Sequence, residues 1–473
     1  MNLESFSIMR HELLLTASAL LVLIAEIFWN PAKKRSVSTF AIILFSLITV
    51  TGFLPSRTGS LFGGMYESTS VRLIMKNILN IGALLVLIQS VTWLNKEENH
   101  ERISEYYVLL ISTLAGMNFM VSAGHFLMFY LGLELATIPL AALAAYDRYN
   151  NKSAEAGIKF ILISALSSGI LLYGLSIIYG TSGSLYFSEV ARHIQNNNLQ
   201  VLGFLFFFAG MAFKISIVPF HLWTADVYEG SPVNITSYLS VISKGAAIFI
   251  FIIILFTVFP VLTIAWQKTI YVTSILTMTI GNLFAIRQQN LKRFLAFSSI
   301  SQAGYILLGI IGGNQTGMAS VVYYILVYIF SNLGAFGVVA AISNATGKET
   351  VDEYNGLYRT NPRLALLMML SLFSLAGIPP VAGFFGKFFL FTAAAEKGFY
   401  LLVLIAVLNT IISLYYYLLV IKAMFINKNE TPVMAFNSDT PARIAMGICV
   451  AGIIITGFAG ILFEIIRNSS FGI

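Results

Sequence analysis

The sequence predicts an all-α membrane protein that crosses the bilayer many times. Of its 473 residues, 58% are hydrophobic and only 10% are charged, and the mean hydropathy is +0.83. A soluble domain carries about 25% charged residues, so a chain this apolar is suited to lipid rather than to water. Its apolar runs are continuous instead of alternating in polarity, which favours spanning helices over an outer-membrane barrel.

About fourteen segments reach the length of roughly 20 apolar residues that a spanning helix needs. They cover approximately residues 9–29, 37–55, 72–94, 104–121, 123–146, 156–180, 199–226, 233–258, 263–286, 292–312, 316–345, 363–393, 398–426 and 441–466. The first segment contains Glu12 and Glu26 and has no basic start, so we expect a retained span rather than a signal peptide. No linker divides the chain, which predicts a single transmembrane domain over residues 1–473.

Two of these segments contain helix-breaking prolines, and the two breaks predict an internal repeat. Pro219 interrupts the seventh segment and Pro379-Pro380 the twelfth, and each break follows a Leu-Phe-x-x-Ala-Gly string. Five helices separate the breaks, so successive repeats would have opposite orientations, as in many transporters. We therefore expect N-terminal helices within residues 1–100, inverted five-helix repeats at about 104–258 and 263–426, and a C-terminal helix at about 441–466.

The net charge of +7 is explained by the loops, so it does not indicate a nucleic-acid partner. Basic residues follow the odd-numbered segments: Lys33, Lys34, Arg35, Lys96, Arg102, Arg148, Lys152, Arg287, Lys348, Arg359, Arg363 and Lys428. Loops after even-numbered segments hold only Arg57, Arg192, Lys268 and Lys397. The positive-inside rule then places the odd loops in the cytoplasm and both termini outside it.

Four isolated charges inside the apolar runs are the candidate functional residues: Glu134, Lys214, Lys244 and Lys387. A lone ammonium in a bilayer costs at least about 2.5–3.5 kcal/mol, so each must face a partner or water. Lys214 and Lys387 lie beside the two helix breaks, where unwound backbone admits water. Titratable groups beside interrupted membrane helices predict a path for protons or ions.

Each candidate also has a purely structural interpretation. Glu134 would either alter how readily a nearby lysine exchanges its proton or only pair with that lysine to hold helices together. The serines before Lys244, from Ser237 to Ser243, would line water or pack helices closely. His221 is a possible proton relay or a helix cap, and Lys292 is a possible proton uptake point or a topological anchor.

The sequence gives no sign of a bound cofactor or metal. Cys449 is the single cysteine, which excludes an intramolecular disulfide and a cluster held by several cysteines of this chain. No glycine-rich dinucleotide or phosphate-binding motif occurs, and the five histidines lack the spacing of metal ligands. We therefore expect no cofactor in this chain.

Three strings in the same order resemble the antiporter-like membrane subunits of NADH:quinone oxidoreductase, the respiratory complex I. They read Phe213-Lys214-x4-Pro219-Phe-His-Leu-Trp223-x2-Asp226-Val-Tyr-Glu-Gly-Ser-Pro232, Asn290-Leu-Lys292-Arg-x2-Ala-Phe-Ser-Ser-Ile-Ser301 and Gly377-Ile-Pro-Pro-x2-Gly383-Phe-x2-Lys387. The similarity extends over nearly the whole chain. Asp226-Val-Tyr-Glu-Gly is most similar to the subunit N branch, and Lys387 fits subunits N and L better than subunit M.

The resemblance implies fourteen helices with two inverted repeats, and proton translocation through Glu134, Lys214, Lys244 and Lys387. NADH, FMN, Fe–S clusters and quinone would then be bound elsewhere in the complex. The implied partners are neighbouring antiporter-like and small hydrophobic subunits in a bacterial inner membrane. The family often has His where Gln302 stands, and Gln does not exchange a proton at neutral pH, so a relay there would need water. The alternative is a subunit of an Mrp-type cation/proton antiporter.

Overall fold

The structure is a computed structural model that describes residues 7–28, 34–429, 432–458 and 460–469. Lys33 lies outside these ranges, and the side chains of Lys34 and Arg35 are not described either. The described chain is almost entirely helical, which confirms the all-α prediction.

The helices follow the predicted segments with boundaries that differ by a few residues. In the first half they are α2 (Arg10–Phe28), α3 (Lys34–Thr51), α4 (Ser70–Leu94), α5 (Ile103–Val121), α6 (Phe126–Ala144), α7 (Asn151–Ser182), α8 (Phe187–His193), α9 (Asn198–Ile215), α10 (Leu222–Gly230), α11 (Val233–Tyr238) and α12 (Lys244–Thr257). The second half holds α13 (Thr263–Ala285), α14 (Leu291–Ile311), α15 (Gln315–Thr346), α16 (Leu357–Thr360), α17 (Pro362–Ala376), α18 (Ala382–Glu396), α19 (Tyr400–Phe425), α20 (Thr440–Phe458) and α21 (Gly460–Arg467).

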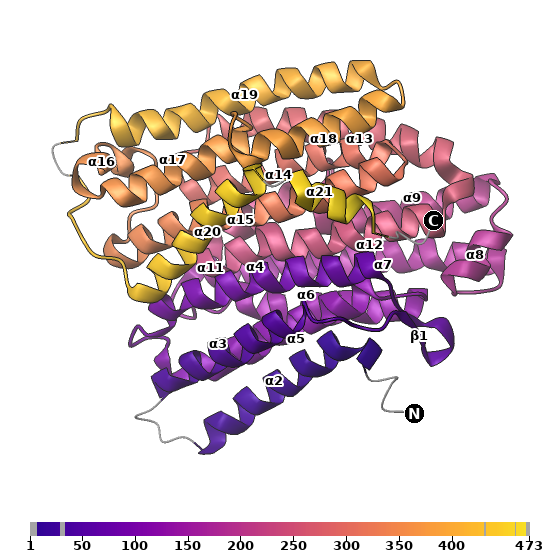
Figure 1. Cartoon of the computed structure of the whole chain (residues 1–473), viewed down its shortest axis with the longest axis horizontal. Helices are drawn as coiled ribbons and strands as arrows, with labels where there is room; N and C mark the ends of the chain where they lie inside the picture. The colour runs from indigo at the N-terminus through magenta and orange to yellow at the C-terminus, as the bar shows by residue number, and fades with distance from the viewer. Residues whose placement is uncertain (1–6, 29–33, 430–431, 459, 470–473) are drawn as a thin grey trace.

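Ten helical segments of the described chain are long and apolar enough to cross a membrane. α3 and α17 are apolar but shorter, so the expected count of fourteen spans stays a prediction. α14 and α15 are the centre of the bundle, since all of their most apolar stretches are buried, and 94% of the corresponding stretch of residues 233–257 is buried too. Figure 1 shows these central helices between α2 at one edge and α19 at the other.

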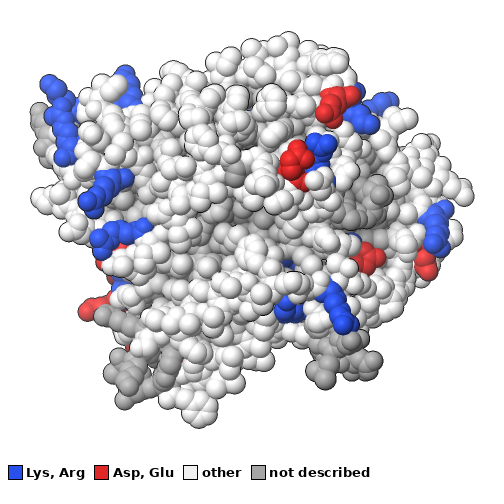
Figure 2. Space-filling model, in the orientation of Figure 1, with Lys and Arg blue, Asp and Glu red and all other residues white. Residues whose placement is uncertain are grey.

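A small hairpin closes one end of the bundle, which we call the hairpin end. Strands β1 (Gly59–Leu61) and β2 (Tyr66–Ser68) pair antiparallel between α3 and α4. The connection after α7 contains the short helix α8, and Tyr186 before it forms a bridge with His125 at the start of α6. In Figure 2, charged side chains lie toward the two ends of this face, with an uncharged band between them. The band is the surface that a bilayer would cover.

Both predicted helix breaks are present, and each begins at a residue in the left-handed region. The residue that caps the end of α9 is Ser216, with φ of 67°, and the residue that caps the end of α17 is Gly377, with φ of 86°. Gly383 at the start of α18 lies so close to α17 that a Cβ there would be 1.7 Å from the Ser374 carbonyl oxygen. The backbone at the second break is therefore held by close packing of α18 against α17.

The two breaks are similar, but the Leu-Phe-x-x-Ala-Gly strings do not align them. Gly377 caps its helix, whereas Gly210 lies inside α9 and packs against Leu171 of α7. The residue at the position of Gly377 is Ser216. Small residues occur at many helix contacts in membranes, so the string similarity reflects packing rather than equivalent positions. The lysines also differ: Lys214 precedes its break and Lys387 follows its own.

Candidate functional site

Lys214 lies in the last turn of α9, next to the first break. Its side chain is buried, and its Nζ donates a hydrogen bond of 2.7 Å to the Thr137 hydroxyl on α6. The ring of Phe160 on α7 lies 5.8 Å from the same ammonium. The lysine is thus held between α6, α7 and α9 by a neutral oxygen and an aromatic face.

Glu134 lies one turn before Thr137 on α6, but it does not contact the lysine directly. Its Oε1 accepts a hydrogen bond of 2.6 Å from the Ser168 hydroxyl on α7. Among the described residues no ion pair joins Glu134 to Lys214, and the two groups have separate hydroxyl partners, Ser168 and Thr137. Glu134 is half-buried and shares its face of α6 with exposed apolar residues, namely Leu131, Leu135 and Ile138.

Lys244 opens α12 directly after a π-helical turn, Leu239–Ser243. Its Nζ donates to the Ser299 hydroxyl (3.0 Å) and carbonyl (3.3 Å) of α14. Of the serines expected to line water, Ser240 contacts the Tyr328 hydroxyl at 3.2 Å and the Asn332 amide at 3.2 Å, both on α15. A π-turn shifts the helix register, and such turns are frequent at functional sites.

Lys387 is buried on α18, and it reaches back across the second break. Its Nζ donates a hydrogen bond of 3.0 Å to the carbonyl of Ala376, the last residue of α17. The Tyr305 ring of α14 lies 4.5 Å from the ammonium. Lys387 therefore also lacks a carboxylate partner among the described residues, and a carbonyl and a ring surround its charge.

A line of polar side chains on α14 runs between Lys244 and Lys387. Ser299 contacts Lys244, and one turn later the Gln302 amide donates to the Leu375 carbonyl at 3.0 Å. Leu375 directly precedes Ala376, the partner of Lys387. The Tyr324 hydroxyl donates to the Gln302 carbonyl oxygen. Gln302, noted in the sequence for its lack of a titratable proton, thus lies in the gap between the two lysines.

The remaining candidates, His221 and Lys292, take different positions. His221 is buried at the first break, and its Nδ1 has no hydrogen-bond partner among the described residues. Lys292 starts α14 at the end opposite the hairpin, where its Nζ contacts Glu349 at 3.2 Å and the Ser231 carbonyl at 3.3 Å. It faces a polar cavity of about 180 Å³. The other charged residues that line this cavity are Lys96, Glu98, Asp147 and Glu349.

An ion-pair network beside this cavity holds α7, α10 and α14 together. Asp226 contacts Arg293 at 2.7 Å and Lys159 at 2.9 Å, and Glu229 contacts Arg293 at 3.0 Å. Both carboxylates belong to helix α10. Asp226 therefore has cationic partners on two other helices, α7 and α14.

Asp226→Asn is expected to lower the stability of the chain at neutral pH and to have no effect in acid. The substitution removes the charge that pairs with Arg293 and Lys159, whereas in acid, below the ordinary aspartate pKa of about 3.9, that charge is lost without any substitution. The groups are partly exposed, so the effect is about 1 kcal/mol or less. Thermal unfolding of the purified complex from pH 7 to pH 3 measures it. The exposed Asp439, changed to Asn, is the control, and an equal effect of both substitutions would contradict the assignment.

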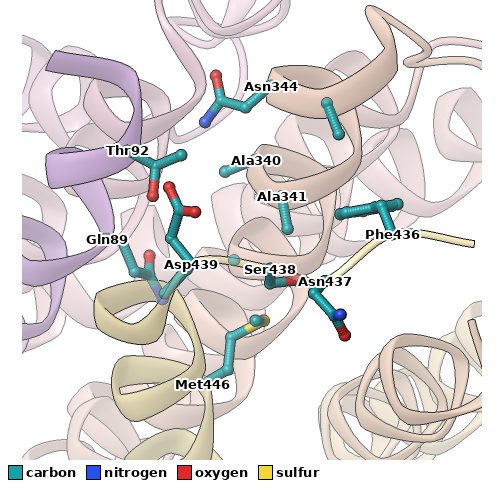
Figure 3. Close-up of a pocket in the computed structure, with 13 residues that line it drawn as sticks. Gln89, Thr92, Ala340, Ala341, Asn344, Phe436, Asn437, Ser438, Asp439 and Met446 are labelled. Carbon is teal, nitrogen blue, oxygen red and sulfur yellow. The ribbon is translucent and has the colours of Figure 1, made fainter. Parts of the chain in front are cut away.

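A separate cavity of about 170 Å³ lies where α4 and α15 end. Figure 3 shows Thr92, Asn344 and Asp439 converging on it from two helices and the segment before α20. None of the predicted site residues lines it. The described residues also contain no group of three His, Cys, Asp or Glu placed to hold a metal ion, and Cys449 is buried with a free thiol.

Sequence comparison identifies the family to which this arrangement belongs. Residues 123–413 match the sequence profile of the NADH:quinone oxidoreductase/Mrp antiporter transmembrane family. The chain is 52% identical over 471 residues to NADH-quinone oxidoreductase subunit N of Phocaeicola vulgatus, covering 99% of this chain and 100% of that protein. The chain belongs to the NADH-quinone oxidoreductase subunit N family. Subunit N of Azobacteroides pseudotrichonymphae is 50% identical and covers the whole of this chain.

Chains of solved structures have the same architecture as this chain. A chain of respiratory complex I from Thermus thermophilus is 27% identical and superposes with a TM-score of 0.81 over 97% of this chain and 100% of that one. A chain of the Mrp complex from Dietzia is 20% identical, with a TM-score of 0.84 over 99% of this chain and 97% of that one. The second likeness concerns the fold alone.

The lysines of the site were visible in the sequence of this subunit N family member, but most of their partners were not. Thr137, Ser299 and Tyr305 each contact one of them. Hydroxyl residues occur throughout membrane helices, so no local pattern marks these three. Only the packing of distant helices brings them to the lysines.

Proposed function

We propose that this chain is the proton-translocating subunit N of a bacterial NADH:quinone oxidoreductase. The observation that carries the proposal is the set of three buried lysines, Lys214, Lys244 and Lys387, each held by neutral oxygens. No carboxylate forms an ion pair with any of them in the described chain. A lysine so placed exchanges its proton when its surroundings change, because nothing fixes the ammonium form.

The proposed route uses these lysines in order. Protons enter at the end opposite the hairpin, where Lys292 faces a polar cavity. His221 would relay protons at the first break. Lys214 and Lys244 carry protons in the first half, and Lys387 carries them in the second. Ser299 and Gln302 lie between the last two. Gln302 contributes only its amide, so water must carry the proton past it.

The same proposal includes the membrane arrangement. The broken segments α9–α10 and α17–α18 each form one interrupted span, which gives fourteen spans in one transmembrane domain over residues 1–473. Two inverted five-helix repeats at about 104–258 and 263–426 place the breaks in corresponding positions. The basic loops face the cytoplasm of a bacterial cell, and both termini and the hairpin end face outward.

Redox chemistry belongs to other subunits in this proposal. NADH, FMN, Fe–S clusters and quinone are bound elsewhere in the enzyme complex, and this chain contributes no redox centre. The half-exposed Glu134 and its apolar neighbours on α6 are where an adjacent antiporter-like or small hydrophobic subunit would act on the lysines. An Mrp-type cation/proton antiporter subunit is the alternative, but the full-length relatives named subunit N favour complex I.

Deletion and complementation in the native bacterium test the function. Membrane vesicles that lack this chain are expected to lose NADH-driven proton uptake, and the tagged chain is expected to restore it. Mild-detergent purification of the tagged chain identifies its neighbours. Co-purification of flavin and Fe–S subunits supports complex I, whereas recovery of membrane subunits alone would favour the antiporter.

Glu134→Gln is expected to reduce proton pumping, but less than removal of Lys214. The substitution removes the charge and keeps the shape and the hydrogen bond from Ser168, so Lys214 stays titratable and loses only its modulator. The measurement is the pH gradient formed per NADH oxidised in vesicles. A greater loss for Glu134→Gln than for Lys214→Ala would show that Glu134 itself carries the proton.

A further inference from the structure

A second group of ionisable side chains lies at the hairpin end, away from the three lysines. Glu12 of α2 and Lys76 of α4 form an ion pair of 2.5 Å, and both side chains are completely buried. The Tyr66 hydroxyl of strand β2 donates to Glu12 at 2.8 Å and accepts from Lys76 at 2.9 Å. We call Glu12, Tyr66 and Lys76 the hairpin cluster.

The geometry of the hairpin cluster is suited to proton exchange. Lys76 can transfer a proton to Glu12 directly, or give it to Tyr66 while Tyr66 passes its own to Glu12. Either way one N–H bond breaks, one carboxyl O–H bond forms, and a neutral amine and acid replace the ion pair. No net charge is created in the apolar interior, which keeps the cost of the step low.

Buried amides extend the hairpin cluster toward the centre of the bundle. Asn80 lies one turn beyond Lys76 on α4, and Asn118 lies near the corresponding end of α5. Both are fully buried, and none of their four amide atoms has a partner among the described residues. A buried polar atom left unsatisfied costs about 1–3 kcal/mol. Bound water is the usual partner of such buried amides.

α5 also connects the level of Asn118 with the central lysines. The Thr113 hydroxyl contacts the Tyr238 hydroxyl at 2.8 Å, and Tyr238 ends α11 just before the π-turn that leads to Lys244. α5 therefore carries two buried polar side chains beyond its first turn, Thr113 and Asn118, and the first of them contacts the segment that leads to Lys244.

The hairpin separates the hairpin cluster from the aqueous side. Gly59 and Ser60 of β1 and Phe62 of the turn are exposed, whereas Tyr66 is fully buried. Charged and titratable neighbours are few: Arg72 pairs with Glu67 at 2.8 Å, His11 contacts Asn77 at 2.9 Å, and Arg10 donates to the Leu54 carbonyl at 2.8 Å. These neighbours bond to other groups, which leaves Glu12 and Lys76 as each other's charge partners.

We propose that the hairpin cluster is an additional proton-carrying site, which exchanges protons between the buried amides and the aqueous phase at the hairpin. It gives the first half of the chain its own connection to that side. This proposal rests on the proposed function, because it requires protons to move through the chain. A purely structural tie between α2 and α4 is the competing role.

Lys76→Arg separates the two roles. Arginine keeps the charge and the ion pair with Glu12 but holds its proton at every accessible pH. Proton uptake per NADH in vesicles is expected to fall while the complex still assembles. Arg72→Lys is the matched control in the same helix, because it exchanges the same two residue types in the neighbouring ion pair. We expect Arg72→Lys to pump like the unmodified chain.

The double variant Glu12→Gln with Lys76→Met supplies a second measurement in case arginine does not fit. It removes both charges and keeps similar volumes, so it leaves no unpaired buried charge. Assembly with a reduced proton yield supports the proposal. A normal yield in either assembled variant overturns it, as does failure of both variants to assemble. Lys214→Ala is measured in parallel: if it too pumps normally, the proposed function itself fails.

Discussion

Lys214→Ala is expected to abolish most NADH-driven proton pumping while the complex still assembles. The side chain is buried beside the first helix break, where it contacts the Thr137 hydroxyl and an aromatic ring. A positioned proton-transfer group contributes on the order of 10²–10⁴-fold to a rate, so we expect the pH gradient to fall by roughly tenfold or more. Removing a buried ammonium also relieves its cost in the membrane, at least about 2.5–3.5 kcal/mol, so the fold should persist.

Two further variants make the Lys214 result specific. Lys214→Arg is expected to pump poorly as well, because arginine binds its proton too tightly to release it. Lys422→Ala is the matched control, since that lysine is exposed in the last turn of α19. The measurement is the pH gradient in vesicles together with the amount of assembled complex. An undiminished gradient in assembled Lys214→Ala would refute an essential role for this residue.

Lys387→Ala is expected to stop pumping through the second half, whereas Lys387→Glu should retain part of it. The ammonium donates to the Ala376 carbonyl across the second break. A glutamate can make the same contact only in its protonated form, so it would load a proton there and release it elsewhere. Alanine offers no titratable group at all.

Packing alone predicts the opposite order for these two variants. Alanine is cheap in lipid and a buried carboxyl is expensive, so a structural role would favour Lys387→Ala over Lys387→Glu. Assembly and proton uptake are therefore measured for both in parallel. Equal pumping by the two assembled variants would reduce Lys387 to a structural residue.

Much of the fold was predictable because a helix that crosses a lipid bilayer needs a long apolar run in the sequence. Long apolar runs placed the helices to within a few residues, and Pro219 and Pro379-Pro380 located the breaks. The end of α9 at Ser216 was not predictable, because serine rarely adopts a left-handed conformation and only the surrounding packing imposes it. The helical conformation around Asp226 was not predictable either, because ion pairs to α7 and α14 hold it in place.

The candidate site was predictable to the extent that charge in an apolar run is conspicuous. Glu134 was expected to pair with a lysine, but the structure gives it Ser168 instead. Glu12 was noticed only as an argument against a signal peptide. Its partner Lys76 lies near the start of a predicted span, where charged residues are common and indicate no particular function. Only tertiary structure brings residues 12, 66 and 76 together.

Under the proposed function, the contact between Lys387 and Ala376 means that different kinds of counter-charge act on the lysines of the two halves of the chain. Ala376 ends α17, and a helix C-terminus carries the equivalent of roughly −0.5 elementary charge. This macrodipole is a counter-charge that no proton can neutralise, and it changes only if α17 itself moves. Glu134, at the surface of the first half, is a counter-charge that a proton or an adjacent protein can cancel. Under the proposed function, the first half would therefore respond to chemistry at its surface, and the second half would respond to displacement of helix α17.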